Sequence, residues 1–273
     1  MKNRLPVYTI FRALLSWIYK LWYNPTIIGS ENIPDSGKCI IASNHIHILD
    51  QCNLIIKTKR YIRYMAKKEY FEGPFSWFFK GVGCICVKRD HQDDEAINTA
   101  KYLLLENQCL GIFPEGTRNN LKEEKIKELF EKYLSDTNYS EFLKKAKTIK
   151  LSQINYLEEL YSKEIITKDE LKNNITKVDL FLKELVKEQK ISDNDYYDNL
   201  LLPLKRGTIK LAYETNSKII PVAVTGNYKF RSKDLTIRIG KPFNVEENKE
   251  KANAQLRKEI TNLLKENLNN SGK

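Results

Sequence analysis

The chain has 273 residues, of which 41% are hydrophobic and 30% are charged. This length and composition are typical of a globular protein with a sizeable buried core, either soluble or bound to a membrane surface. The five cysteines form no Cys-x-x-Cys pair, which argues against a disulfide framework or a zinc knuckle and favours a reducing cytosol.

The chain has a net charge of +11, and the excess of basic residues lies entirely outside residues 120–199. This segment has 15 basic and 17 acidic residues, whereas the rest of the chain has 31 basic and 18 acidic residues. Such a surplus predicts an anionic partner, which could be phosphate groups, nucleic acid or an acidic membrane surface. A lysine-rich solvated surface explains the charge equally well, and no nucleic-acid-binding module is recognisable in the sequence.

Residues 5–23 predict an amphipathic helix. Eight apolar residues recur there at steps of three and four, which places them on one helical face: Val7, Ile10, Phe11, Leu14, Leu15, Ile18, Leu21 and Trp22. Arg12, Ser16 and Lys20 interrupt the run, which is shorter than the ~20 apolar residues of a membrane-spanning helix. The flanking aromatic and basic residues suit a helix in a membrane interface. An ordinary helix packed on the core remains the alternative.

From residue 25 onwards, short β-rich runs alternate with helical stretches. The expected strands are the runs CIIAS, YIRYMA, VGCICVK, CLGIF, KIIPVAVTG and LTIRIG, and the expected helices lie at 93–107, 205–217 and 249–268. Asp93 or Asp94 can cap the first of these helices. Buried strands separated by helices indicate an α/β fold, which we expect to be a single domain with a central mixed sheet flanked by helices.

Residues 120–199 differ from the rest of the chain. They are rich in Lys, Glu, Asn and Leu, contain no Gly or Pro, and indicate consecutive helices, with Thr167–Glu170 as a capping box. We therefore predict an inserted helical subdomain at 120–199, an α/β domain at 25–119 and 200–273, and an N-terminal membrane-anchoring helix at 1–24.

The segment SNHIHILDQ contains two of the three histidines and permits three interpretations. A metal site needs three or more ligands, and beyond His45 and His47 the chain offers only His91 and its acidic neighbours. An acid–base pair needs only His45 and Asp50, because a carboxylate that fixes one imidazole nitrogen leaves the other free to take a proton. In the third interpretation, the two residues merely cap a helix.

Two further blocks follow expected strands and carry cations. GCICVKRD places Lys88 and Arg89 directly after one strand, and FPEGTRN places Glu115, Gly116, Thr117 and Arg118 after the next. Loop residues after strands commonly contact ligands, and Lys88, Arg89 and Arg118 are suited to bind phosphate. Gly116 permits a positive φ or a close backbone approach. Each block taken alone is better explained as a turn with solvated charges.

The order and spelling of these blocks resemble the bacterial 1-acyl-glycerol-3-phosphate acyltransferases of the PlsC type. The Asn-His-x-x-x-x-Asp motif of that family matches Asn44, His45 and Asp50. Its next two blocks match Gly83–Arg89 and Phe113–Arg118, and its fourth matches the IIPVAV run with Pro221. The resemblance covers about 190 residues on both sides of the insertion. Two features depart from the family pattern, namely His47 and the length of the insertion.

The resemblance implies a glycerophospholipid acyltransferase. His45, held by Asp50, would deprotonate the sn-2 hydroxyl of lysophosphatidate, which would attack the thioester of acyl-CoA or acyl-carrier protein. Asn44, Lys88, Arg89, Glu115, Gly116, Thr117 and Arg118 would contact the substrate. Neither a metal nor a cofactor is required. We expect no nucleic-acid partner. The resemblance implies a peripheral or monotopic protein at the cytoplasmic face of the cell membrane, in contact with anionic lipid. A sister enzyme with another lysolipid or glycerol 3-phosphate as acceptor, or an inactive membrane-binding protein, remains the alternative.

Overall fold

The computed structural model describes residues 5–88, 93–231 and 234–270. Its contacts divide the chain into two compact units. The first comprises residues 1–116 and 204–273, and the second comprises residues 117–203. The first unit carries the sheet, and the second is helical.

The first unit is built on a seven-stranded sheet in the order β1-β7-β6-β2-β5-β3-β4. All neighbouring strands are parallel except β6 and β7, which are antiparallel. The strands are β1 (Thr26–Ile28), β2 (Cys39–Ser43), β3 (Ile62–Lys67), β4 (Ile85–Val87), β5 (Cys109–Ile112), β6 (Lys218–Thr225) and β7 (Thr236–Ile239). The predicted α/β fold with a central mixed sheet is confirmed, and all six expected strands are present. β1 was not predicted, because three residues are too few to give a pattern.

Strand β2 lies at the centre of the sheet and is buried along its whole length. Its neighbours β5 and β6 run parallel to it, with Ile41 opposite Gly111 on one side and Ile220 on the other. Strands β5 and β3 lie on one side of β2 in the sheet, whereas β6 and β7 lie on its other side. The carboxyl end of β2 is therefore a switch point of strand order, where open α/β sheets commonly bind ligands.

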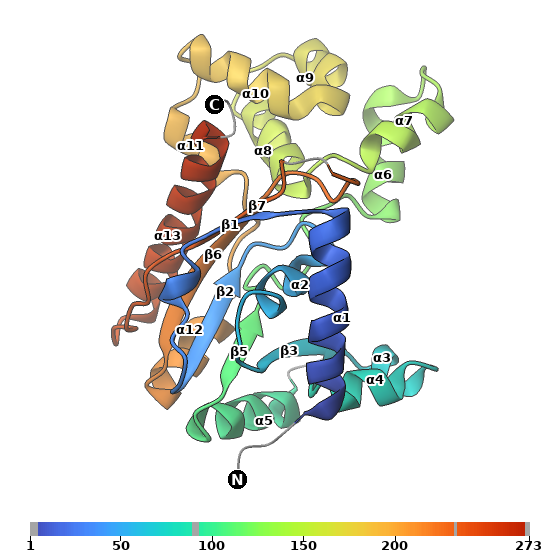
Figure 1. The fold of residues 1–273 in the computed structure, drawn as a ribbon. Coiled ribbons are helices and arrows are strands. Elements are labelled where there is room, and N and C mark those ends of the chain that lie inside the picture. Colours follow the sequence, from blue (N-terminus) through green and yellow to red (C-terminus); the bar gives the residue numbers. More distant parts are fainter. Residues whose placement is uncertain (1–4, 89–92, 232–233, 271–273) are drawn as a thin grey trace. The chain divides into compact units, whose positions relative to one another are not determined.

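Helices cover both faces of this sheet (Figure 1). One face packs against α5 (Asp94–Leu105), α12 (Gly207–Thr215) and α13 (Lys249–Asn270). These are the three helices expected from the sequence. The Asp93 side chain caps α5 by accepting a hydrogen bond from the Ala96 N–H. The other face packs against α1 (Pro6–Trp22) and α2 (Asp50–Ile55), whose Tyr8, Leu54 and Ile55 join the core with Ile41 and Ile220. The short helices α3 (Glu69–Glu72) and α4 (Ser76–Gly81) lie between β3 and β4.

Helix α1 is attached to the first unit by polar groups as well as by apolar contacts. Tyr8 and Tyr19 are each only 1% exposed. The Tyr8 hydroxyl accepts from the Ile62 N–H at 3.1 Å, Arg12 donates to the Lys59 carbonyl at 2.8 Å, and the Tyr19 hydroxyl donates to the Leu49 carbonyl at 3.2 Å. The buried strip of α1 is thus centred on its tyrosines.

The apolar face predicted for α1 is divided between the core and the surface. Val7, Phe11 and Leu15 are half-buried against the core. The other five predicted residues are exposed, namely Ile10, Leu14, Ile18, Leu21 and Trp22. Trp17 is exposed as well. Neither sequence interpretation of this helix therefore accounts for all of it. Within the part of the chain that the structure describes, no helix has the length and hydropathy required to cross a bilayer.

The second unit has its own apolar core, in which Leu129, Ile154, Leu157 and Leu182 are at most 1% exposed. Buried Asn119 donates to the Leu200 carbonyl and the Ser152 hydroxyl at 2.9 Å each, which joins the two ends of the unit. The predicted capping box of Thr167 and Glu170 is present. Its helices are α6 (Glu123–Leu129), α7 (Tyr139–Ala146), α8 (Leu151–Ser162), α9 (Lys168–Asn174), α10 (Val178–Lys187) and α11 (Asp193–Asp198), with a π turn at Phe130–Leu134 and a 3₁₀ turn at Ile175–Lys177.

Candidate active site

Three loops of the first unit meet at the carboxyl edge of the sheet. His45 follows the central strand β2, Phe113 follows β5, and Tyr228 follows β6. Because β5 and β6 flank β2, the parallel register carries all three loops to the same edge. The segment around His45 is thus a connection from a buried strand to helix α2.

The Asp50 carboxylate is the centre of this connection. Its side chain is fully buried, and its Oδ2 accepts from three donors: His45 Nδ1 at 2.7 Å, the Ile46 N–H at 2.7 Å and the His47 N–H at 2.8 Å. Its Oδ1 accepts from the Tyr228 hydroxyl at 2.6 Å. A buried carboxylate with this many donors is compensated for its loss of water.

The His45 ring is held in one orientation. It stacks on Phe113 with a centroid distance of 4.0 Å and an interplanar angle of 13°. Since two main-chain N–H groups also donate to Asp50 Oδ2, that oxygen acts as an acceptor and His45 Nδ1 carries the proton. The His45 side chain is 18% exposed. Its Nε2 therefore has a free lone pair and is suited to act as a base.

His47 has different contacts from His45. Its ring stacks on Tyr228 at 4.3 Å and 18°, and its Nδ1 accepts from the Leu49 N–H at 3.3 Å. The two histidines of the segment therefore do not form a symmetric pair. Among the described residues, no cluster of three or more His, Cys, Asp or Glu side chains could hold a metal ion.

Asn44 and Glu115, both predicted to contact substrate, are buried and contact main-chain groups beside His45. The Asn44 amide donates to the Val224 carbonyl at 2.9 Å and accepts from the Val224 N–H at 2.7 Å, which ties the end of β2 to β6. Glu115 Oε1 accepts from the His45 N–H at 2.7 Å. Both side chains thus fix the backbone that carries His45.

Gly116 has the positive φ that its residue type permits, at +71°. A Cβ atom at this position would lie 2.6 Å from Cε of Lys205, so the Lys205 side chain lies directly against Gly116. The Lys205 N–H donates to the Pro114 carbonyl at 2.9 Å, which fixes Lys205 beside the loop after β5. The structure thus brings an exposed cation to the strand next to β2, and Lys205 was not among the predicted residues.

Of the remaining predicted residues, Lys88 lies apart from His45. Lys88 follows the edge strand β4 and forms an ion pair with Glu95 at 3.3 Å, while its N–H donates to Asp93 at 2.6 Å. At the usual spacing between strands, β4 lies roughly 14 Å from β2. Arg89 and His91 are outside the described residues. Thr117 and Arg118 begin the second unit.

The structure adds Tyr228 and Asn53 to the candidate site. Tyr228 lies in the loop after β6, and its position after a buried strand is a signal that the sequence does carry. Asn53 lies inside α2, and no sequence pattern distinguishes it.

Nearby Cys52 is unsuited to nucleophilic attack, because burial and the Asp50 charge raise its pKa to about 12.

Comparisons with known proteins identify the family of the chain. A family model described as Acyltransferase matches residues 24–225. Over 96 residues, the chain is 34% identical to proteins named 1-acyl-sn-glycerol-3-phosphate acyltransferase from Bacillus subtilis (strain 168) and Borreliella burgdorferi. Each match covers 34% of this chain. It covers 48% of the Bacillus subtilis protein and 38% of the Borreliella burgdorferi protein. The chain thus matches less than half the length of these curated relatives.

A structural comparison supports the fold. The crystal structure of the 1-acyl-sn-glycerophosphate acyltransferase PlsC from Thermotoga maritima aligns with a TM-score of 0.56 and 15% identity, over 97% of this chain and 83% of that one. This likeness concerns the fold alone. The family model, by contrast, matches most of this chain and includes His45, Asp50 and the block at Phe113. The predicted family is confirmed, and the chain belongs to the Acyltransferase family.

Proposed function

We propose that the protein transfers an acyl chain from a thioester to the sn-2 hydroxyl of 1-acyl-glycerol 3-phosphate, which gives phosphatidate. The observation that carries this proposal is the His45–Asp50 pair at the carboxyl end of β2, in which Nδ1 is bound to Asp50 and the His45 side chain is 18% exposed. The names of the two curated relatives support the same acceptor. The donor would be acyl-CoA or acyl-carrier protein, and no other cofactor takes part.

The reaction needs one base and one proton return. His45 Nε2 takes the proton of the sn-2 hydroxyl as its oxygen attacks the thioester carbonyl carbon. The tetrahedral intermediate then collapses, its carbon–sulfur bond breaks, and the imidazolium returns the proton to the leaving thiolate. Asp50 stays ionised throughout and stabilises the imidazolium. The products are phosphatidate and a free thiol.

The acceptor phosphate would be bound by cations close to His45. Lys205 lies beside the loop after β5, the strand next to β2. Of the predicted cations, Arg89 and Arg118 stay candidates for this recognition, whereas Lys88 lies on the edge strand and is paired with Glu95. A charge-assisted contact to phosphate is worth about 1.5–3 kcal/mol, which is enough to separate acceptors that carry a phosphate from those that lack it.

We further propose that the protein works at the cytoplasmic face of the cell membrane, as a peripheral or monotopic protein. Six large apolar side chains of α1 are between 47% and 69% exposed. Phe75, directly before the neighbouring helix α4, and Trp77 on α4 are 66% and 65% exposed, and Val7 of α1 lies against Gly81 of α4. A patch of this kind marks a binding surface, and its aromatic side chains suit a membrane interface.

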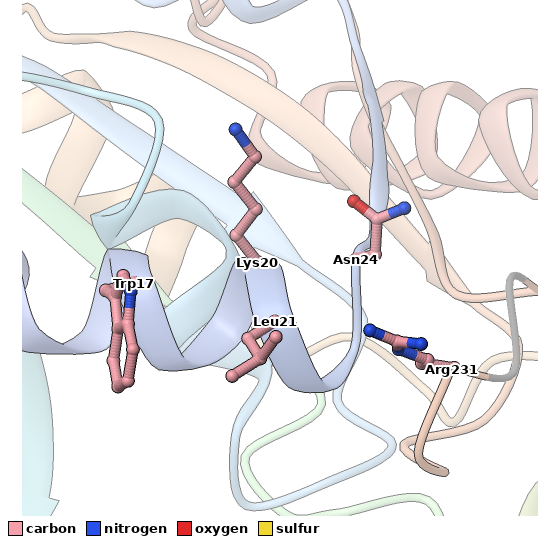
Figure 2. A pocket seen from close by; sticks show the side chains of 5 residues that line it. All are labelled: Trp17, Lys20, Leu21, Asn24 and Arg231. Carbon is pink, nitrogen blue, oxygen red and sulfur yellow. The ribbon is translucent and has the colours of Figure 1, made fainter.

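Cations accompany this apolar surface. A groove of about 590 Å³ is lined by Trp17, Lys20, Leu21, Asn24 and Arg231. In Figure 2, Arg231 points towards the end of α1 beside Leu21, whereas the Lys20 side chain extends away from Trp17 and Leu21. This combination of apolar and basic side chains suits an anionic lipid surface, with which the net charge of +11 agrees.

The first test is the acceptor. In an assay of thiol release with acyl-CoA and with acyl-carrier protein, we expect the highest rate with 1-acyl-glycerol 3-phosphate. A 1-monoacylglycerol of the same chain length should react at least about tenfold more slowly, because it lacks the phosphate. A preference for glycerol 3-phosphate would identify a sister acyltransferase, and no release with any acceptor would reject the proposal.

The second test separates the two histidines. His45→Ala should lower the rate of thiol release by about 10²- to 10⁴-fold, the usual contribution of a general base. His47→Ala serves as the control, and we expect it to cost less than about tenfold, since the His47 ring stacks on Tyr228 and its Nδ1 accepts from the Leu49 N–H, whereas the His45 ring is bound to Asp50. A greater loss in His47→Ala than in His45→Ala would show that the base has been misassigned.

The third test concerns the membrane. Replacing both Trp17 and Leu21 with Glu should reduce co-sedimentation with anionic vesicles by about tenfold or more, because two apolar side chains no longer enter the interface. The matched control replaces Tyr102 and Leu105 with Glu. These residues are 60% and 62% exposed, and they lie on α5, which covers the opposite face of the sheet. Equal binding losses in both double variants would contradict the proposed surface.

A further inference from the structure

Tyr228 reaches the site from a distant part of the chain. It lies in the loop between β6 and β7, and its hydroxyl donates to Asp50 Oδ1 at 2.6 Å across 178 positions of sequence. The three donors from residues 45–47 all bind the other oxygen, Oδ2. Tyr228 therefore holds the side of the carboxylate that faces away from the base.

The direction of this hydrogen bond is fixed by Asn53. The Asn53 amide is completely buried, and its Nδ2 donates to the Tyr228 oxygen at 2.6 Å. The Tyr228 oxygen already accepts a hydrogen bond from Asn53. The single proton of the Tyr228 hydroxyl is therefore directed to Asp50. Burial, followed by the nearby Asp50 charge, raises the pKa of Tyr228 above its usual range, so the group remains a donor.

The ring of Tyr228 is also fixed. One side stacks on His47 at 4.3 Å, and Tyr23, at the end of α1, meets it edge-on at 5.7 Å and 80°. These contacts leave the hydroxyl little freedom to turn away from Asp50. Such preorganisation of the groups around a base preserves the geometry that proton transfer requires.

We propose that Tyr228 is a positioning residue for the acyl transfer, which acts on His45 through Asp50. It keeps the Asp50 carboxylate in the one orientation that presents Oδ2 to His45 Nδ1. Asn53 supports it by directing the hydroxyl proton. This inference rests on the proposed function, because it assumes that His45 is the base.

The test is the variant Tyr228→Phe, which keeps the ring and removes only the hydroxyl. We expect kcat to fall by about tenfold while the acceptor KM stays within about twofold, because the lost hydrogen bond acts on the base and not on substrate binding. The matched control is Tyr196→Phe in the second unit, where a buried tyrosine hydroxyl also donates to a carboxylate, Asp179, at 2.9 Å. The control should retain its kcat.

A double-mutant cycle with Asp50→Asn separates positioning from general stability. If Tyr228 acts through the Asp50 charge, adding Tyr228→Phe to Asp50→Asn should lower kcat by less than about twofold more. Full additivity, a wild-type kcat in Tyr228→Phe, or a rise in the acceptor KM alone would each overturn the inference. Full activity in His45→Ala would instead reject the proposed function itself, so the two failures are distinguishable.

Discussion

The buried carboxylate of Asp50 is the constraint on which the rest of the candidate site depends. An ionised carboxylate out of contact with water is costly unless donors surround it, and here His45, two main-chain N–H groups and Tyr228 provide them. Each donor is thereby fixed in place. The same contacts that stabilise the buried charge determine the tautomer of His45, the path of the backbone from β2 to α2, and the position of the loop after β6.

The backbone around this carboxylate is fixed by buried polar side chains. Asn44 continues the hydrogen bonding between β2 and β6 beyond the last paired residues, and Glu115 holds the His45 N–H from the loop after β5. Both groups lie at the carboxyl ends of the central strands β2 and β5. The reactive nitrogen is thus placed by rigid neighbours, which a base for proton transfer requires.

Much of the fold and the central pair of the site could be predicted from the sequence. Buried apolar runs mark the strands clearly, and the spacing of His45 and Asp50 suits a turn from a strand into a helix. The supporting residues could not be found in this way. Tyr228 and Lys205 meet the site only through the order of the strands, and Tyr228 contacts Asn53 and Asp50 across 175 and 178 positions of sequence. Asn53 is close to Asp50 in the sequence, but no local pattern indicates its bond to Tyr228. For α1, periodicity identified the apolar arc but not which edge of it packs on the core.

The structure also connects α1 to the site. Tyr19 of α1 donates to the carbonyl of Leu49, the residue before Asp50, and Tyr23 packs against Tyr228. Because polar groups and tyrosines attach this helix, its larger apolar side chains remain on the surface. The proposed membrane surface and the proposed base are therefore built on the same helix-to-loop contacts within the first unit.

The central claim is that Asp50 holds His45 with its proton on Nδ1 and its Nε2 free. Nitrogen NMR of protein labelled with ¹⁵N-histidine, at a pH where the ring is neutral, tests this directly, and the His47→Ala variant assigns the signals. We expect the His45 ring to show a protonated Nδ1 and an unprotonated Nε2, and to lose this preference in Asp50→Asn. A His45 ring protonated on Nε2 in the unaltered protein would contradict the account.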